Sequence, residues 1–276
     1  MLASHEAAVR LLVFAAMLLG MGLWEARAPR RPPTVRTARR RASNLGLAAL
    51  NAGALRLCGP LSAAAAAELC AVRGWGLLHQ IAGPPLLEGG GAIVLLDLAV
   101  YGQHVAFHAT PWLWRIHLVH HADRDLDVTS GLRFHTAEIL LSAALKVAAV
   151  AALGAAPTAV IAFECLLNAT AMFNHGNVRI PPRTDRWLRR LVVTPDMHRV
   201  HHSTLRREAH SNFGFNLPWW DLLFGTYRAQ PAAGHEGMTL GLVHPRDERV
   251  VESLPGMLAM PLVEPGDPSH LAADAS

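Results

Sequence analysis

The sequence is poor in charge and in cysteine. Charged residues make up 17% of the 276 positions, whereas a soluble domain has roughly 25%. The cysteines are Cys58, Cys70 and Cys165, too few for a disulfide scaffold. Glycine shows no three-residue period, which excludes collagen, and a hydrophobic content of 51% excludes a disordered chain. Together with a mean hydropathy of +0.23, these absences predict a membrane protein.

Four apolar segments are long enough to cross a bilayer, which takes about 20 helical residues. They are residues 7–24, 45–72, 91–107 and 137–173. Pro60 predicts a kink in the second segment, and Gly154 to Pro157 divide the fourth into a helical hairpin. Lys146 and Glu164 would lie at similar depth in that hairpin, where we expect them to pair. A signal peptide is the alternative for the first segment, but its positive charges follow the apolar run.

Arginine is concentrated between the first two apolar segments. Seven arginines lie within 15 positions: Arg27, Arg30, Arg31, Arg36, Arg39, Arg40 and Arg41. Cytoplasmic loops of membrane proteins carry such an excess, so we place residues 25–43 in the cytoplasm. Alternating crossings then put residues 73–90 outside and residues 104–135 and 175–276 inside. Nucleic acid is not an expected partner, because no aromatic residues that could stack on bases interrupt the arginines.

Histidine is abundant and clustered. Ten of the 16 histidines lie between positions 104 and 202. They form an HxxxH motif at 104–108, HxxHH motifs at 117–121 and 198–202, and single histidines at 135 and 175. Because residues i, i+3 and i+4 share one helix face, each motif on a helix directs its imidazoles to one side. Thr194, Pro195 and Asp196 predict the start of the helix that carries the last motif.

This pattern indicates metal binding, since neutral imidazole is the commonest protein metal ligand. Eight to ten converging nitrogens are about twice what one ion accepts, so we expect two ions. The cysteines that structural zinc sites usually include lie far from the motifs, and the Glu-x-x-His of carboxylate-bridged di-iron bundles does not occur. A lone HxxxH arises by chance, but three motifs together do not. The other histidines are expected at the surface: His5, His79, His235, His244 and His270. His210 is left unassigned.

Five stretches of the sequence together resemble the fatty acid hydroxylase/sterol desaturase superfamily of integral-membrane di-iron enzymes. They are DLAVYGQHVAFHATPWLWRIHLVHHADRDLDVTSGLRFH, NHGNV, TPDMHRVHHS, SNFG and WDLLFGT, within residues 91–228. The resemblance implies ten metal ligands: His104, His108, His117, His120, His121, His135, His175, His198, His201 and His202. It also implies use of O2 on lipids, with electrons from a separate donor. Val105 and Ser211 depart from residues frequent in the family and leave the subfamily open.

We therefore expect an all-α protein, in which polytopic membrane helices carry a cytoplasmic helical cap with the histidine motifs. Residues 1–90 would form N-terminal transmembrane helices and the basic loop. Residues 91–228 would form the catalytic domain. Residues 229–276, rich in proline and glycine, are expected to be an extended or partly disordered tail.

The expected function is that of a membrane-bound di-iron oxygenase that hydroxylates, or desaturates, a lipid or sterol-like substrate from the bilayer. Two iron ions are the expected cofactors, with zinc as a substitute in purified material. Because no haem, flavin or iron–sulfur motif occurs, we expect a separate electron donor of the ferredoxin or cytochrome b5 type. A zinc-dependent membrane hydrolase and a histidine-rich metal carrier are the alternatives. Five acids are candidates to orient the imidazoles through their ring N–H groups: Asp97, Asp123, Asp125, Asp127 and Asp196.

Overall fold

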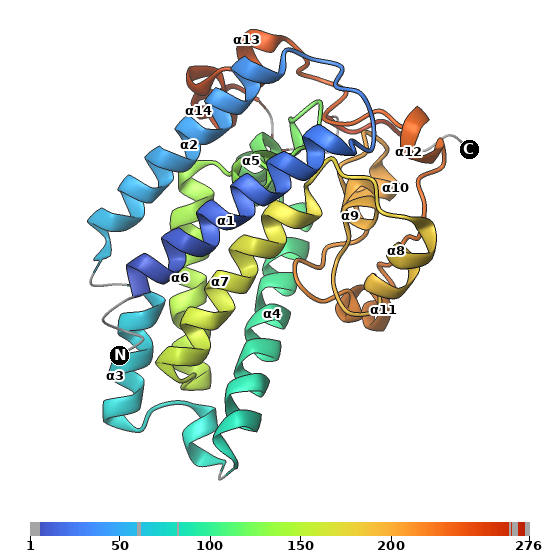
Figure 1. Ribbon diagram of the computed structural model, residues 1–276. Coiled ribbons are helices and arrows are strands. Elements are labelled where there is room, and N and C mark those ends of the chain that lie inside the picture. The colour runs from blue at the N-terminus through green and yellow to red at the C-terminus, as the bar shows by residue number, and fades with distance from the viewer. Residues whose placement is uncertain (1–5, 60–61, 82, 265, 267–269, 274–276) are drawn as a thin grey trace.

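The computed structural model describes residues 6–59, 62–81, 83–264, 266 and 270–273. These residues form helices joined by loops, and they include isolated bridges but no strand. The long helices make an elongated bundle, and shorter helices of the second half of the chain gather beside one end of it (Figure 1). The predicted all-α class is confirmed.

Three of the described helices are long and apolar enough to cross a membrane. They are α1 (Glu6–Arg27), α4 (Pro85–Ala109) and α6 (Thr136–Leu153). On α1, Leu12 and Leu19 are 68% and 67% exposed, which is costly in water but natural in contact with lipid. The first, third and fourth apolar segments of the sequence are thus helical as predicted.

The second apolar segment does not form one kinked helix. The chain instead makes α2 (Thr37–Leu57) and α3 (Ala63–Arg73), with a new helix start at Ser62, whose hydroxyl accepts from the Ala65 N–H. Helix α2 begins inside the arginine-rich stretch and buries Arg40, Asn44 and Asn51. The expected single kinked helix over 45–72 is therefore wrong: the segment is two helices, α2 has a polar face that packs inside the protein, and neither is among the described helices long and apolar enough to cross a membrane alone. Pro60 lies outside the described residues.

The predicted hairpin is confirmed by α6 and α7 (Pro157–Asn174). Gly154 ends α6 with a φ of +68°, and a Cβ there would lie 2.4 Å from the Trp75 carbonyl oxygen, so only glycine fits. Helices α3, α4, α6 and α7 pack around one apolar core that includes Leu96 and Phe163. This bundle positions α4, whose C-terminal end carries the first histidine motif.

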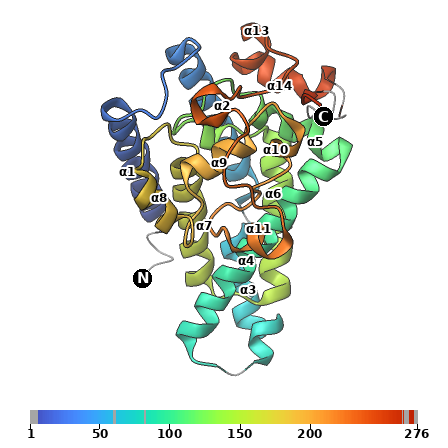
Figure 2. The same cartoon turned by 90° about the vertical axis from the view of Figure 1, so that its right-hand side faces the viewer.

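The remaining elements surround that end of the bundle (Figure 2). They are η3 (Leu77–Gln80), α5 (Pro111–His121), η4 (Ser130–Leu132), α8 (Pro182–Leu188), α9 (Pro195–His201), α10 (Arg206–Ala209), α11 (Trp219–Phe224), α12 (Gly234–Gly237), α13 (Glu248–Val251) and α14 (Leu254–Val263). Of these elements, only η3 does not lie at that end of the bundle; it follows α3 and contacts α6. Helix α14 packs against α5 and α2, and it buries Met257 and Met260 in a shared core with Leu242 and Leu271. The expected extended tail therefore contains three short helices and contributes to the core.

Candidate metal centre

Three helices carry the histidine motifs, as the i, i+3, i+4 spacing predicts. His104 and His108 lie in the last turns of α4, the second motif ends α5, and the third lies on α9. Thr194 caps α9 by accepting from the Met197 N–H at 3.4 Å. All eight motif histidines are buried, and so is His175 at the end of α7.

The structure brings nine of the ten predicted ligands together in two groups. In each group the candidate ligand atoms all lie within 4.8 Å of one another. The five-histidine group consists of His104, His108, His117, His121 and His201. The four-histidine group consists of His120, His175, His198 and His202.

The two groups are adjacent and interleaved. Each HxxHH motif divides its members between them, so that neighbours in sequence such as His120 and His121 serve different groups. The rings of His121 and His202, one from each group, are stacked with centroids 4.6 Å apart. Two ion positions side by side fit this arrangement, as the number of histidines predicts.

Hydrogen bonds fix which ring nitrogen is available. His104 Nδ1 lies 2.7 Å from the Phe213 carbonyl oxygen, and His175 Nδ1 lies 2.7 Å from that of Ala171. His120 and His201 bond backbone carbonyls in the same way, at 3.1 and 2.8 Å. Because a carbonyl oxygen only accepts, each Nδ1 carries the proton. The lone pair of each Nε2 is then free to bind a metal.

The four-histidine group shows the fit to a cation most directly. His175 Nε2 lies 3.1 Å from the Nε2 atoms of His120, His198 and His202. In His120 and His175 the proton is on Nδ1, so two lone pairs face each other at that distance. Metal–nitrogen bonds of about 2.0–2.1 Å place neighbouring ligand atoms about 3.0–3.4 Å apart. The observed spacing is what a shared ion requires.

The five-histidine group fits an ion for a second reason. Nε2 of His104, His117 and His201 is buried without a hydrogen-bond partner, and so are both ring nitrogens of His108 and His121. Buried polar atoms without partners are rare and costly. A bound ion would satisfy these nitrogens together.

Burial keeps the imidazoles in the neutral form that binds metals. It lowers the pKa of His117 to about 3 and that of His175 to about 4. Burial, and secondarily the neighbouring imidazoles, lower the pKa of His121 and His202 well below the usual value. These side chains are therefore uncharged throughout the physiological range.

His135 does not join either group, contrary to the resemblance. It is the residue before α6, and its Nδ1 accepts from the Ala137 N–H at 3.1 Å. Its Nε2 lies 3.3 Å from the Leu258 carbonyl oxygen. His135 thus caps the start of α6 in this chain. The sequence around His135 could not distinguish this capping role from metal binding.

Three further histidines lie where the sequence did not predict them. His235 and His270 are 6% and 2% exposed, so the expectation of a surface position is wrong for both. His270 Nδ1 bonds the His244 carbonyl oxygen at 2.7 Å. The unassigned His210 lies beside the centre, with its ring centroid 5.4 Å from that of His108. His79 and His244 are exposed as expected, and His5 lies outside the described residues.

The five candidate aspartates bind other groups than the imidazoles of the centre. Asp97 accepts from the Trp220 indole, Asp123 and Asp127 bind Arg40, Asp125 accepts from Thr34, and Asp196 binds Arg30 and Arg199. The expectation that they orient the imidazoles is therefore not met by these contacts.

The carboxylate that does hold an imidazole was missed. Glu138 on α6 is 3% exposed, and its Oε1 lies 2.7 Å from His117 Nδ1. Its place in the first turn of an apolar helix, three residues after His135, was the only signal in the sequence.

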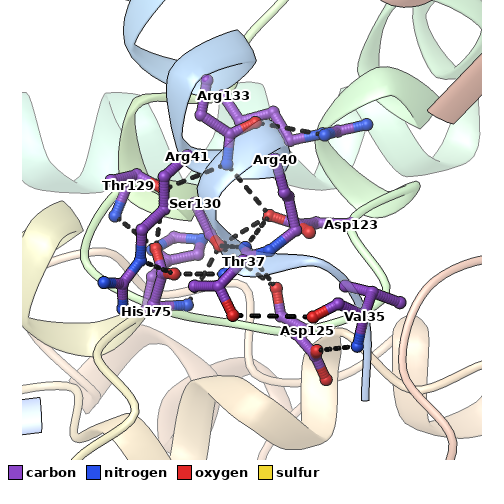
Figure 3. A network of polar contacts seen from close by, with 12 residues as sticks. Val35, Thr37, Arg40, Arg41, Asp123, Asp125, Thr129, Ser130, Arg133 and His175 are labelled. Carbon is purple, nitrogen blue, oxygen red and sulfur yellow. Dashed lines mark hydrogen bonds and ion pairs between the residues drawn. The ribbon is translucent and has the colours of Figure 1, made fainter. Parts of the chain in front are cut away.

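A buried ionic network supports the loop that follows the second motif (Figure 3). Arg40 of α2, 1% exposed, donates to Asp123 Oδ2 at 2.9 Å and to the Asp125 carbonyl oxygen at 2.8 Å, and it also binds Asp127. The same loop ends at Arg133, whose carbonyl oxygen accepts from His120. The arginine-rich stretch and the histidine centre thus lie at one end of the molecule, as the sequence predicts.

The fold and site define a helical membrane protein with two adjacent, buried groups of histidines that could bind metal. Residues 90–226 match the model of the fatty acid hydroxylase family. This chain belongs to the fatty acid hydroxylase family.

Three characterised relatives agree with the family. The ornithine lipid hydroxylase OlsE of Rhizobium tropici is 32% identical over 139 residues, which are 50% of this chain and 41% of the relative. Alkylglycerol monooxygenase of Homo sapiens is 28% identical, over 56% of this chain and 33% of the relative. Cholesterol 25-hydroxylase of Mus musculus is 25% identical, over 56% and 55%. The chain thus matches between a third and just over half of each relative's length. No solved structure matches the chain.

Proposed function

We propose that this protein is a membrane-bound di-iron oxygenase that hydroxylates a lipid or sterol-like substrate. The observation that carries the proposal is the pair of adjacent, buried histidine groups, in one of which the Nε2 lone pairs of His120 and His175 face each other at 3.1 Å. The family supports the proposal, and so do the names of the three relatives, which all denote hydroxylation or monooxygenation of lipid molecules.

The nine clustered histidines would hold two iron ions. Bound iron supplies the oxidation of an unactivated C–H bond by O2, which zinc, being without redox chemistry, cannot supply. Nitrogen ligands alone do not exclude zinc, so zinc remains the ion expected as an inactive substitute in purified material. His135 is left out of this ligand set because its ring contacts backbone groups of α6 and α14.

The chain itself contributes orientation and exclusion of water. Backbone carbonyls and Glu138 hold Nδ1 of five imidazoles, so that each ring presents Nε2 in a fixed direction. Every member of both groups is buried, which keeps bulk water from the reacting atoms. The apolar surface of the spanning helices would let an apolar substrate approach the centre from the bilayer.

The electron donor would be a separate protein of the ferredoxin or cytochrome b5 type. Hydroxylation is proposed over desaturation on the names of the relatives, since the two outcomes differ only in how the substrate is placed. A histidine-rich carrier would need ligands along a transmembrane path, whereas here they gather at one end. A zinc hydrolase would need neither O2 nor a reductant.

Iron content and O2 consumption test the proposal. Purified wild-type protein should bind close to two irons per chain and consume O2 with a lipid extract and a reductant. His120→Ala and His201→Ala should each abolish O2 consumption, while the protein remains inserted in the membrane. His79→Ala, at an exposed position of η3, is the control and should keep full activity. Activity that survives in either ligand variant, or hydrolysis without O2 by zinc-loaded protein, would refute the proposal.

A further inference from the structure

An apolar surface lies on the short helices beside the metal centre and not on the spanning helices. It consists of six large side chains on α8, α11 and the turn after α8, exposed by 43–68%: Trp187, Leu191, Trp219, Leu222, Leu223 and Phe224. We call it the α8–α11 surface. Six such side chains so exposed would be a liability in water.

The two halves of this surface are fixed to each other. Trp219 Nε1 donates to the Arg190 carbonyl oxygen at 2.8 Å, which ties α11 to the turn after α8. The Arg190 guanidinium lies 4.3 Å from the centroid of the Trp187 ring. Tryptophan with arginine beside it is the composition of protein surfaces at the boundary between hydrocarbon and headgroups.

The surface continues directly from a helix that can span the membrane. Phe224 stacks on Tyr101 of α4 with centroids 5.5 Å apart, and Trp220 Nε1 donates to Asp97 of α4 at 2.8 Å. Figure 2 shows α11 lying against α4 below α9 and α10.

The depth of these contacts follows from the helix rise. The apolar span of α4 begins at Leu86, so Asp97 and Tyr101 lie about 16 and 22 Å along it. The hydrocarbon core of a bilayer is about 30 Å thick. A bilayer that surrounds α4 from the start of its span therefore reaches the level of α11.

We propose that the α8–α11 surface is immersed in the membrane interface, so that the bilayer itself covers it. The cap is then not a domain held above the membrane in water. The segment between α10 and α11 supplies the Phe213 and Ser211 carbonyl oxygens that hold His104 and His201. By the same helix rise, His104 and His108 lie about 27 and 33 Å along the α4 span. Immersion of α11 therefore places the five-histidine group at the boundary of the hydrocarbon, where a lipid chain would reach it without leaving the bilayer. The immersion itself does not depend on the proposed reaction.

Spin-label accessibility in nanodiscs tests this proposal. Leu223→Cys and Leu191→Cys are made in a background with Cys58→Ser, Cys70→Ala and Cys165→Ala, and each is labelled with a nitroxide. Collisions with O2, which concentrates in hydrocarbon, are compared with collisions with a water-soluble nickel complex. The full-length, iron-loaded protein is used, and iron content before and after labelling verifies that each variant is folded.

Two reference positions calibrate the measurement. Leu19→Cys, 67% exposed on α1, reports hydrocarbon, and Glu236→Cys, on α12 with a side chain 77% exposed, reports water. We expect the ratio of O2 to nickel collisions at Leu223 and Leu191 to exceed that at Glu236 several-fold and to approach that at Leu19. Ratios equal to that at Glu236 would overturn the proposal and leave a water-facing surface for a protein partner.

Discussion

Removal of the Arg40 guanidinium should destabilise the protein more than any exposed arginine does. In Arg40→Met, Asp123 and Asp127 lose the guanidinium that pairs with them. The loss is costly because the two carboxylates are buried, with side chains 0% and 3% exposed. Breaking a buried ion pair by removing one partner costs about 3–5 kcal/mol. Since Arg41 still contacts Asp127 at 2.7 Å, we expect a loss near the lower end, about 3 kcal/mol.

The assay is unfolding of the purified protein in mixed micelles with an increasing fraction of SDS. Arg39→Met, an exposed neighbour on α2, is the matched control and should change the free energy of unfolding by less than about 0.5 kcal/mol. Adding Asp123→Asn to Arg40→Met should restore part of the stability, because the unpaired buried charge is then gone. The reasoning fails if Arg40→Met unfolds like Arg39→Met, or if the double variant is less stable than the single variant.

The same network predicts a dependence on pH. Burial acts to raise the pKa of Asp127, but Arg40, Thr129 and Arg41 outweigh it and hold the pKa below the usual value. A carboxyl with a lowered native pKa stabilises the fold above its unfolded pKa of about 3.9, and this contribution is lost as the pH falls further. Without Arg40 the native pKa of Asp127 rises, so this loss of stability in acid should shrink or reverse in Arg40→Met. The difference in free energy of unfolding between the wild type and Arg40→Met should therefore narrow as the pH falls from about 6 to about 3, and a difference that widens would contradict the reasoning.

Three further predictions concern the membrane helices and the centre. Glu164→Gln should cost more stability than Lys146→Met, since it removes a contact from two cations, Lys146 and Arg10, of which only Arg10 keeps another carboxylate, that of Glu6; additive effects in the double variant would contradict the pairing. Glu138→Leu should lower iron affinity about 10- to 100-fold, measured by competition with a chelator, and Glu138→Gln should retain most of it because its amide oxygen still accepts from the imidazole. A topology reporter fused after Arg41 should lie in the cytoplasm and one near Gly89 outside, and equal readings would refute the proposed orientation.

The features that the sequence predicts best depend on short-range patterns. The motifs fall on helices because the i, i+3, i+4 spacing and the Thr194 cap are local properties. The hairpin is predictable because Gly154 and Pro157 mark one helix end and the next start. The pairing of Lys146 with Glu164 at 2.5 Å follows from the same turn.

The features that the sequence did not predict depend on packing between distant segments. Nothing local indicates that α2 turns Arg40 and Asn44 inward to meet a loop some 80 residues later. The tail was expected to be extended from its prolines, yet Pro255 starts α14 and Pro261 lies within it. The aspartates near the motifs were favoured as partners of imidazole because of their proximity in sequence, whereas backbone carbonyls and Glu138 take that place.

The interleaving of the two groups has a consequence for how the centre is loaded with metal. Helix α5 gives two imidazoles to the five-histidine group and one to the other, and α9 does the reverse. An ion in either position would therefore immobilise both helices, and a second ion would meet ligands that have already lost their conformational freedom. Such coupling would make the second binding step the tighter one. A chain titrated with iron should accordingly pass from empty to doubly loaded with few singly loaded molecules between. Neither group of histidines would then bind its ion independently of the other.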